Sequence, residues 1–372
     1  TQEWLPLMHP SLDRILSRDF LAAEDLPEGA RSTVDGYAVR AADTFGASDS
    51  IPAFLEVAGA VSMGSVPDFG IGPGQAAQIP TGGFLPRGAD AVVMVEYTNP
   101  AGAGSIEVTR PVTLRTNVLE RGEDARLGEI LLPRGKLLRP QEVGFLAALG
   151  VTDVPVHRAP SVAVISSGDE IVPIERKPEA GQIRDANGHA IAALVRSCGG
   201  NPVVPGIVPD NARLLKEAVR RELERADVVT LSGGSSVGTR DLMVDAVAGI
   251  PGVEILAHGV AIKPGKPTLL AACGGKAILG LPGHPVSALI VAQVFLAPFL
   301  RHLQGGTMEK GPLGMKVRAT LATSVHSTIG LEEYIRVRLE VSVPGDFSAY
   351  PIFGKSGMIS TMVQATGMVT IP

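Results

Sequence analysis

Residues 211–231 read NARLLKEAVRRELERADVVTL, a stretch in which a predicted helix leads directly into a predicted strand. Over residues 211–226 the apolar positions recur at helical spacing and share one face, opposite the charged residues: Leu214, Leu215, Ala218, Val219 and Leu223. Residues 227–231 (DVVTL) form a short β-branched run that is typical of a buried strand. The stretch therefore predicts one helix–strand unit of an α/β domain.

The same alternation of strand and helix extends over residues 160–303. Residues 161–166 (SVAVIS) are predicted to form a strand, and Asn187 is expected to cap the helix that follows. Such alternation predicts a doubly wound, mostly parallel sheet with helices on both faces. Ligands bind beyond the carboxyl ends of the strands in this class of sheet. We therefore expect the loops at residues 166–170 and 232–241 to form a site.

The regions on either side of this domain predict other modules. Residues 53–119 are rich in Gly, Pro and short strands such as 91–95 (AVVMV), which indicates a β-rich module. A helix is expected to begin at Pro140 and end at Gly150. Beyond residue 304, alternating patterns at residues 315–321 and 334–341 indicate a small β-barrel or sandwich.

Composition and charge argue against several classes of protein. The chain has 372 residues, 45% of them hydrophobic, which is enough for more than one core. Its net charge is -5 and its basic residues are scattered, so no nucleic-acid partner is expected. Cys198 and Cys273 lie far apart without CxxC spacing, which fits a reducing cytoplasm and supports neither a disulfide framework nor a zinc site. The apolar stretch 277–300 contains several prolines, so we expect it to be too interrupted to cross a membrane and to form a strand, a turn and a buried helix.

A glycine-rich loop follows the strand at residues 227–231. It reads SGGSSVGTRD over residues 232–241, and its successive backbone amides could form a nest that binds phosphate. Asp241 would then stand beside the phosphate, which requires an intervening cation such as Mg²⁺. The alternative is a tight glycine turn in which Asp241 only caps the next helix.

Two further turns carry groups that suit an anion. Residues 263–267 (KPGKP) bring the ammonium groups of Lys263 and Lys266 together on a stiff turn, where they repel unless an anion lies between them. Residues 280–287 (GLPGHPVS) follow, and the hydroxyl of Ser287 could face the same cleft. A solvated lysine turn and an ordinary strand-to-helix turn are the alternatives. Neither lysine of the first turn nor Lys355 lies in a complete Walker A loop, and no GxSxG or GxGxxG motif is present.

Taken together, these blocks resemble the MoeA-type molybdopterin molybdotransferases, the family of the gephyrin E domain. The resemblance covers nearly the whole chain. It is carried by motifs in the family's order: STVDGYAV at 32–39, PTGG at 80–83, PRGADAVV at 86–93, RGED at 121–124, SGDE at 167–170, GQIRDAN at 181–187, SGG at 232–234, KPGKP at 263–267, GLPGHP at 280–285 and SGMIS at 356–360.

The resemblance implies a homodimer of four-domain subunits. It implies a connecting domain at residues 1–21 and 123–153, a β-rich module with DGYAV and PTGG at 22–122, a MogA-like molybdopterin-binding domain at 154–303 and a C-terminal β-barrel at 304–372. The active cleft is expected between the MogA-like domain of one subunit and the β-rich module of the other. Expected partners are a MogA-like molybdopterin adenylyltransferase and molybdoenzyme chaperones, with no membrane involved.

The resemblance also implies the reaction: molybdate enters adenylated molybdopterin, AMP is released, and Mg²⁺ is required. Implied catalytic residues are Asp35, Thr81, Asp124, Asp210 and Asp241. Implied Mg²⁺ ligands are Glu170 and Asp241. Implied substrate-binding residues are Ser167, Gly168, Ser232, Gly233, Gly234, Ser235, Gly238, Lys263, Lys266, Pro282, Ser287, Arg336 and Ser356.

The sequence departs from the family pattern at two positions. His284 stands where the family usually carries Asn, and Leu331 stands where Arg is common. These changes are expected to affect the choice between molybdate and tungstate rather than the fold. A peptide-binding scaffold of the gephyrin type and the adenylyltransferase step itself are the competing functions, and the whole-chain resemblance disfavours the second.

Overall fold

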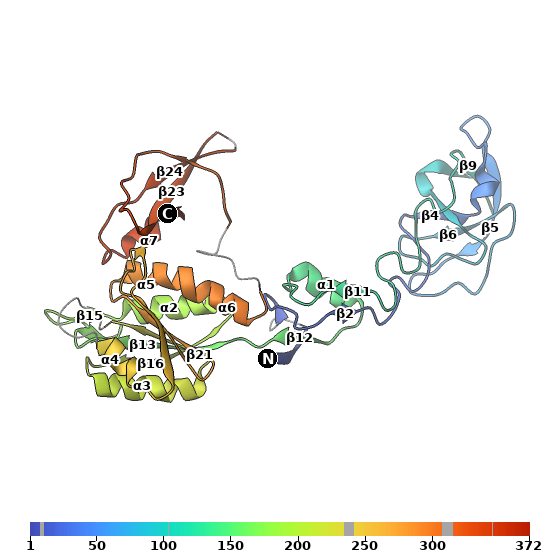
Figure 1. The fold of residues 1–372 in the computed structure, drawn as a ribbon. Helices are drawn as coiled ribbons and strands as arrows, with labels where there is room; N and C mark the ends of the chain where they lie inside the picture. The colour runs from blue at the N-terminus through green and yellow to red at the C-terminus, as the bar shows by residue number, and fades with distance from the viewer. Residues whose placement is uncertain (8–10, 103, 234–241, 307–314, 344) are drawn as a thin grey trace. The chain divides into compact units, whose positions relative to one another are not determined.

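The computed structural model describes residues 1–372 except 8–10, 103, 234–241, 307–314 and 344 (Figure 1). The chain divides into two compact units. Unit 1 comprises Thr1–Leu5, Asp13–Ser17 and Pro155–Pro372, and unit 2 comprises Pro6–Leu12 and Arg18–Val154.

A six-stranded sheet forms the centre of unit 1. Its strand order is β16-β13-β17-β21-β20-β18. The first four strands in this order are parallel to one another, and the last two form an antiparallel edge. The predicted mostly parallel sheet is therefore confirmed. The strands span β13 (Ser161–Ser167), β16 (Asn201–Val208), β17 (Val228–Ser232), β18 (Val253–His258), β20 (Leu269–Cys273) and β21 (Lys276–Leu281).

Helices cover both faces of this sheet (Figure 1). Successive strand residues point to opposite faces, so Val164 and Ile165 of β13 enter two different cores. The Val164 face packs against one group of helices and the Ile165 face against the other, which confirms the doubly wound arrangement. The first group is α2 (Ala186–Ser197), α5 (Pro285–Val291), η4 (Ala292–Leu296) and α6 (Ala297–Leu303), and the second is α3 (Ala212–Arg225) and α4 (Leu242–Ala248).

The N-terminal caps of α3 and α2 confirm one prediction and contradict another. The side chain of Asn211 accepts hydrogen bonds from the backbone N–H groups of Arg213 and Leu214, so α3 begins as predicted. The prediction that Asn187 caps α2 is wrong. Asp185 is the cap and accepts from the N–H of Gly188, whereas Asn187 already lies inside the helix. Its side chain is therefore free for another contact.

The predicted order of strand, turn and buried helix in the most apolar stretch is confirmed, but the expectation that its prolines leave too short a helix to cross a bilayer is wrong. Pro285–Leu303 is one helix of 19 residues with a mean hydropathy of 1.6, which by length and composition alone could cross a bilayer. Pro298 follows the π-helical segment η4 and lies in the first turn of α6, where a missing N–H is tolerated. The fully buried Ile290, Leu296 and Leu300 pack in the sheet core, so within unit 1 this is a core helix.

A second, five-stranded sheet in unit 1 contains the C-terminal residues. Its order is β19-β23-β24-β22, with β25 also paired to β23. The predicted strand at 334–341 is confirmed, but the alternating run at 315–321 is a strand only at Thr320–Leu321, because residues 315–319 are exposed and pack against no sheet. No pairing among the described strands closes a barrel, so closure stays a prediction. The elements are β19 (Ile262–Lys263), β22 (Thr320–Leu321), β23 (Glu332–Val343), β24 (Asp346–Pro351), α7 (Ser360–Gln364) and β25 (Gly367–Ile371).

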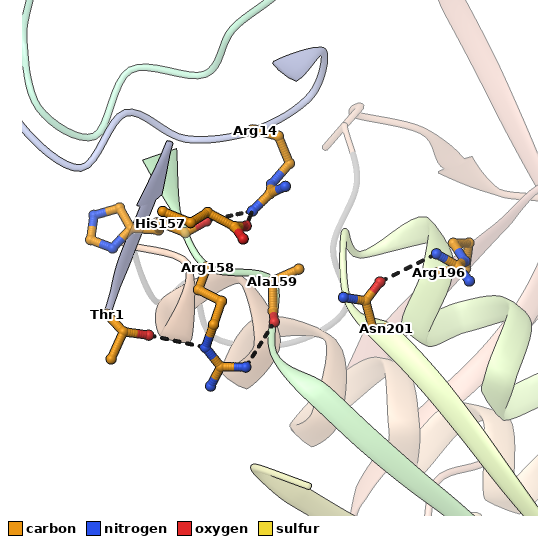
Figure 2. A network of polar contacts seen from close by, with 8 residues as sticks. Thr1, Arg14, His157, Arg158, Ala159, Arg196 and Asn201 are labelled. Carbon is orange, nitrogen blue, oxygen red and sulfur yellow. Dashed lines mark hydrogen bonds and ion pairs between the residues drawn. The ribbon is translucent and has the colours of Figure 1, made fainter. Parts of the chain in front are cut away.

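Polar contacts join the first residues of the chain to the segment that leads into the central sheet (Figure 2). The Nε atom of Arg158 donates to the hydroxyl of Thr1 at 3.1 Å. The Nη2 atom of Arg14 donates to the carbonyl of His157 at 2.6 Å and also binds Glu3. These contacts explain why Thr1–Leu5 and Asp13–Ser17 belong to unit 1.

Unit 2 contains the predicted β-rich module. Its six-stranded sheet has the order β7-β4-β6-β5-β9-β8, and the DGYAV motif supplies β4. Gly36 lies in that strand, where an added Cβ would stand 1.9 Å from the carbonyl oxygen of Val93. Only glycine fits this close backbone approach. The strands are β4 (Gly36–Val39), β5 (Ala53–Ala60), β6 (Gln75–Ile79), β7 (Ala91–Met94), β8 (Thr98–Pro100) and β9 (Ser105–Val108).

Shorter elements complete the two units. The predicted helix at Pro140 is confirmed as α1 (Pro140–Ala148). The remaining elements are the 3-10 helices η2 (Ala41–Thr44) and η3 (Val95–Tyr97) and four two-stranded pairs: β1 (Gln2–Pro6) with β12 (Asp153–His157), β2 (Phe20–Leu21) with β11 (Ile130–Leu132), β3 (Arg31–Ser32) with β10 (Val118–Leu119), and β14 (Ile171–Val172) with β15 (Ile183–Arg184).

Candidate active site

A cavity of about 1010 Å³ opens in unit 1 beyond the carboxyl ends of the parallel strands. This volume lies at the upper end of the range for small-molecule sites. Glu170 follows β13, Gly233 follows β17, and residues 282–287 follow β21, as the doubly wound sheet predicts. Leu331 and Ser356 line it from the C-terminal sheet and its loops.

The predicted site residues fall into four groups. Those that line the cavity are Glu170, Gly233, Lys263, Lys266, Pro282, Ser287 and Ser356. Those in unit 1 that lie outside its lining are Ser167, Gly168, Asp210, Ser232 and Arg336. Those in unit 2 are Asp35, Thr81 and Asp124. Gly234, Ser235, Gly238 and Asp241 lie outside the described residues.

The KPGKP turn presents its two lysines in different ways. The Nζ atom of Lys263 donates to Glu333 Oε1 at 2.8 Å and to Thr328 Oγ1 at 3.1 Å. The side chain of Glu333 is only 7% exposed. Lys266 is exposed, and its ammonium group forms no hydrogen bond or ion pair in the described part of the chain. The charge of Lys263 is therefore already partly offset by a carboxylate that sequence reasoning missed, and binding of one anion by both lysines stays a prediction.

Hydrogen bonding keeps Glu333 ionised. The donor Lys263 lowers the pKa of the Glu333 carboxyl, and the backbone N–H of Thr328 adds to this effect at 2.9 Å from the same oxygen. A buried carboxylate with two donors is stable only while both remain in place.

The start of helix α2 is fixed to two walls of the cavity. Asp185 is buried, and its Oδ1 accepts from Ser166 Oγ at 2.9 Å, which joins the helix to the end of β13. The Nδ2 atom of Asn187 donates to the carbonyl of Gly283 at 2.8 Å, which joins the helix to the turn after β21. These contacts give Asp185 and Asn187, both in the GQIRDAN motif, roles that sequence reasoning missed.

The strand ends beside the cavity carry polar groups suited to phosphate. The hydroxyl of Ser232 is buried at the end of β17 and has no hydrogen-bond partner among the described residues. Gly233 follows with a φ of +112°, and an added Cβ would stand 1.8 Å from the carbonyl oxygen of Ser167. Ser167 Oγ donates to Asp210 Oδ1 at 2.9 Å, so Asp210 fixes the neighbouring strand end. The unpaired Ser232 hydroxyl gains a partner if an oxyanion binds here.

The C-terminal segment closes another side of the cavity. The backbone N–H of Val286 donates to the carbonyl of Ser356 at 3.0 Å, which joins the first turn of α5 to the SGMIS motif. Arg336 donates from Nη2 to the carbonyl of Gly354 at 3.1 Å, and burial lowers the pKa of its guanidinium. His284 and Leu331, the two departures from the family pattern, both face the cavity.

The structure brings Asp35 and Thr81 together in unit 2. Asp35 Oδ1 accepts from the backbone N–H of Thr81 at 2.6 Å and from its hydroxyl at 2.9 Å. These donors lower the pKa of the Asp35 carboxyl. Asp124 is exposed on the turn of the RGED motif, where its N–H donates to the carbonyl of Leu26.

The residues present are compatible with Mg²⁺. Glu170 lines the cavity, and its carboxylate has no partner within the described ranges. No group of three or more His, Cys, Asp or Glu residues able to hold a metal occurs there either. Mg²⁺ is commonly held by one or two carboxylates together with substrate phosphates, so Glu170 can serve in such a site.

Three family models match successive parts of the chain. The MoeA N-terminal region (domain I and II) matches residues 1–150, a probable molybdopterin binding domain matches 163–302, and the MoeA C-terminal region (domain IV) matches 318–372. A molybdopterin molybdenumtransferase from Staphylococcus aureus is 31% identical over 365 residues, which are 98% of this chain and 86% of that protein. One from Nostoc is 35% identical over 371 residues, covering 96% and 82%.

A solved structure agrees with these relatives. The molybdopterin biosynthesis MoeA protein from Pyrococcus horikoshii has 36% sequence identity and a TM-score of 0.82, and the match covers 100% of this chain and 90% of that one. The fold, the ordered motifs and the cavity thus define one class of protein: the chain belongs to the MoeA family. It is a transferase, as the curated family members are.

Proposed function

We propose that this protein inserts molybdate into adenylated molybdopterin and releases AMP in a Mg²⁺-dependent reaction. One observation carries the proposal: a single cavity is lined by Lys266, which forms no hydrogen bond or ion pair among the described residues, and by Gly233, which follows Ser232, whose buried hydroxyl has no partner among them either. The curated relatives are named molybdopterin molybdenumtransferase, which supports molybdenum transfer to molybdopterin. The family matches outside residues 163–302 favour it over an adenylyltransferase built from the central domain alone.

The geometry suggests a division of the cavity between the two substrates. We assign Lys266 and the hydroxyl of Ser287 to molybdate, because both line the cavity and neither forms an ion pair among the described residues. Ser232 and Gly233 are placed to hold a phosphate of the adenylated pterin. Cleavage of the linkage between that phosphate and AMP builds negative charge on the phosphate oxygens, and preorganised donors stabilise that charge. Mg²⁺, held by Glu170 when bound, supplies further charge neutralisation there.

Lys266 offers the most direct test of this division. Lys266→Ala should raise the KM for molybdate at least about tenfold, because the fixed positive charge is lost, while affinity for the adenylated pterin changes little. Lys316→Ala is the matched control, since Lys316 is exposed and lies outside the cavity lining. A collapse of pterin affinity with unchanged molybdate dependence would assign the KPGKP turn to the pterin phosphate instead.

We further propose that two subunits share each active site. The Asp35–Thr81 pair is exposed and acts as the contribution of unit 2, and the cavity is the contribution of unit 1 from the other subunit. Mixing inactive Asp35→Ala chains with inactive Asp241→Ala chains should restore part of the activity, because a mixed dimer contains one cleft with both residues intact. Absence of recovery in heterodimers shown to form would refute the sharing. A cytoplasmic location and a MogA-like adenylyltransferase partner complete the proposal.

A further inference from the structure

Glu333 lies next to Lys263 because their strands, β19 and β23, are neighbours in the five-stranded sheet of unit 1. Strand β19 pairs in parallel with β23, and this register sets Lys263 beside Glu333. The two side chains differ sharply in exposure, at 53% for Lys263 and 7% for Glu333. Lys263 therefore reaches the cavity while its counter-charge stays behind the wall.

The carboxylate of Glu333 depends on Lys263 for its charge balance. Its Oε1 accepts from the Lys263 ammonium at 2.8 Å and from the neutral N–H of Thr328 at 2.9 Å. If Lys263 turned fully toward an anion in the cavity, this buried carboxylate would lose its only charged donor in the described structure. Leaving a buried charge uncompensated is costly, so Glu333 opposes that movement.

Lys266 shows the contrast within the same turn. It lines the same cavity three residues later, and no carboxylate in the described structure forms an ion pair with it. One lysine of the turn thus offers its full charge to an anion, and the other offers a charge that is partly neutralised. Conservative replacement of Glu333 would remove this difference.

We infer that Glu333 is a positioning residue that weakens the hold of Lys263 on a tetrahedral dianion and so sets the charge selectivity of the cavity. The inference rests on the proposed function, in which that dianion is molybdate. Coulomb energy scales with the product of the charges, so Glu333 opposes a dianion about twice as strongly as a monoanion. Tight ground-state binding does not raise kcat. Weaker binding of molybdate by Lys263 lets molybdate move from the lysine to the pterin during the transfer.

Anion titration of the full-length protein tests this inference. Calorimetry would give the Kd of molybdate, a dianion, and of perrhenate, a tetrahedral monoanion. Glu333→Gln keeps a hydrogen-bond acceptor but loses the charge, so it should tighten molybdate binding roughly tenfold and perrhenate binding only about threefold. Glu332→Gln is the matched control, because Glu332 is the exposed neighbour on the other face of β23. It should change neither Kd by more than about twofold.

The same substitution in chains that lack Lys263 distinguishes a positioning role of Glu333 from a purely structural one. In Lys263→Met chains, Glu333→Gln should tighten molybdate binding much less than in otherwise intact chains, because the lysine through which Glu333 acts is gone and a buried carboxylate without a charged donor takes up a proton. In otherwise intact chains, Glu333→Gln should lower both the KM for molybdate and kcat.

Equal or weaker molybdate binding by a folded Glu333→Gln protein would overturn the inference, and so would equal gains for both anions. If the unsubstituted protein binds molybdate and releases AMP in those cases, the proposed function stands and only the role of Glu333 fails. If it binds no molybdate and releases no AMP, the proposed function fails and this inference fails with it.

Discussion

Replacing Asn187 tests how helix α2 positions the turn after β21. Its Nδ2 atom donates to the carbonyl of Gly283 at 2.8 Å, and Asn187 is 9% exposed. Asn187→Ala leaves that carbonyl without this donor, which should cost about 1–3 kcal/mol. At roughly 2–4 °C per kcal/mol for a domain of this size, the Tm of unit 1 should fall by about 2–12 °C in scanning calorimetry.

The same substitution should affect the cavity. Gly283 and His284 line it, so release of the turn should raise the KM for molybdate. Asn211→Ala is the matched control, because Asn211 caps α3 and its loss should cost about 1 kcal/mol without changing KM. The reasoning is refuted if Asn187→Ala loses stability as Asn211→Ala does but keeps its KM and kcat, or if it loses no stability.

Three further substitutions test other parts of the account. Gly36→Ala should destabilise unit 2 by about 2 kcal/mol or more, measured as a lower Tm, because its Cβ would stand 1.9 Å from the carbonyl oxygen of Val93. The pKa of Glu142 is lowered to about 2 from 4.5, chiefly by hydrogen bonding from Arg139, so ionised Glu142 stabilises the fold above about pH 4.5 and this contribution is lost as the pH falls toward 2. Glu142→Gln should therefore be less stable than the parent at pH 7, and acid unfolding followed by circular dichroism should show that difference disappearing near pH 2. Asp35→Asn should keep its fold, since the Thr81 donors retain an acceptor, but should slow AMP release by roughly tenfold or more.

Elements with strong local signals could be predicted from the sequence. Helix α3 and strand β17 follow from the periodicity of residues 211–231 and from the cap at Asn211, all within a short stretch of chain. The position of the cavity follows from the parallel order of the strands. A local pattern suffices where the physical cause is itself local.

Features that depend on distant pairing could not be predicted. Glu333 meets Lys263 across 70 residues only because β19 pairs with β23, and no pattern near either residue indicates that pairing. The cap of α2 is Asp185 rather than the predicted Asn187 because the backbone becomes helical two residues earlier than expected, and the sequence alone does not fix that point. The alternating run at residues 315–321 predicts a longer strand than the structure contains. Alternation alone does not form a strand without a neighbouring strand to pair with, and only Thr320–Leu321 is a strand.

The measurement that tests the central claim most directly is AMP release by the purified full-length protein incubated with adenylated molybdopterin, with and without molybdate and Mg²⁺. The proposed function predicts that AMP and molybdenum cofactor form in equal amounts, only when molybdate is present, and that chelation of Mg²⁺ stops both. No AMP release with all components present, or release that does not depend on molybdate, would contradict it.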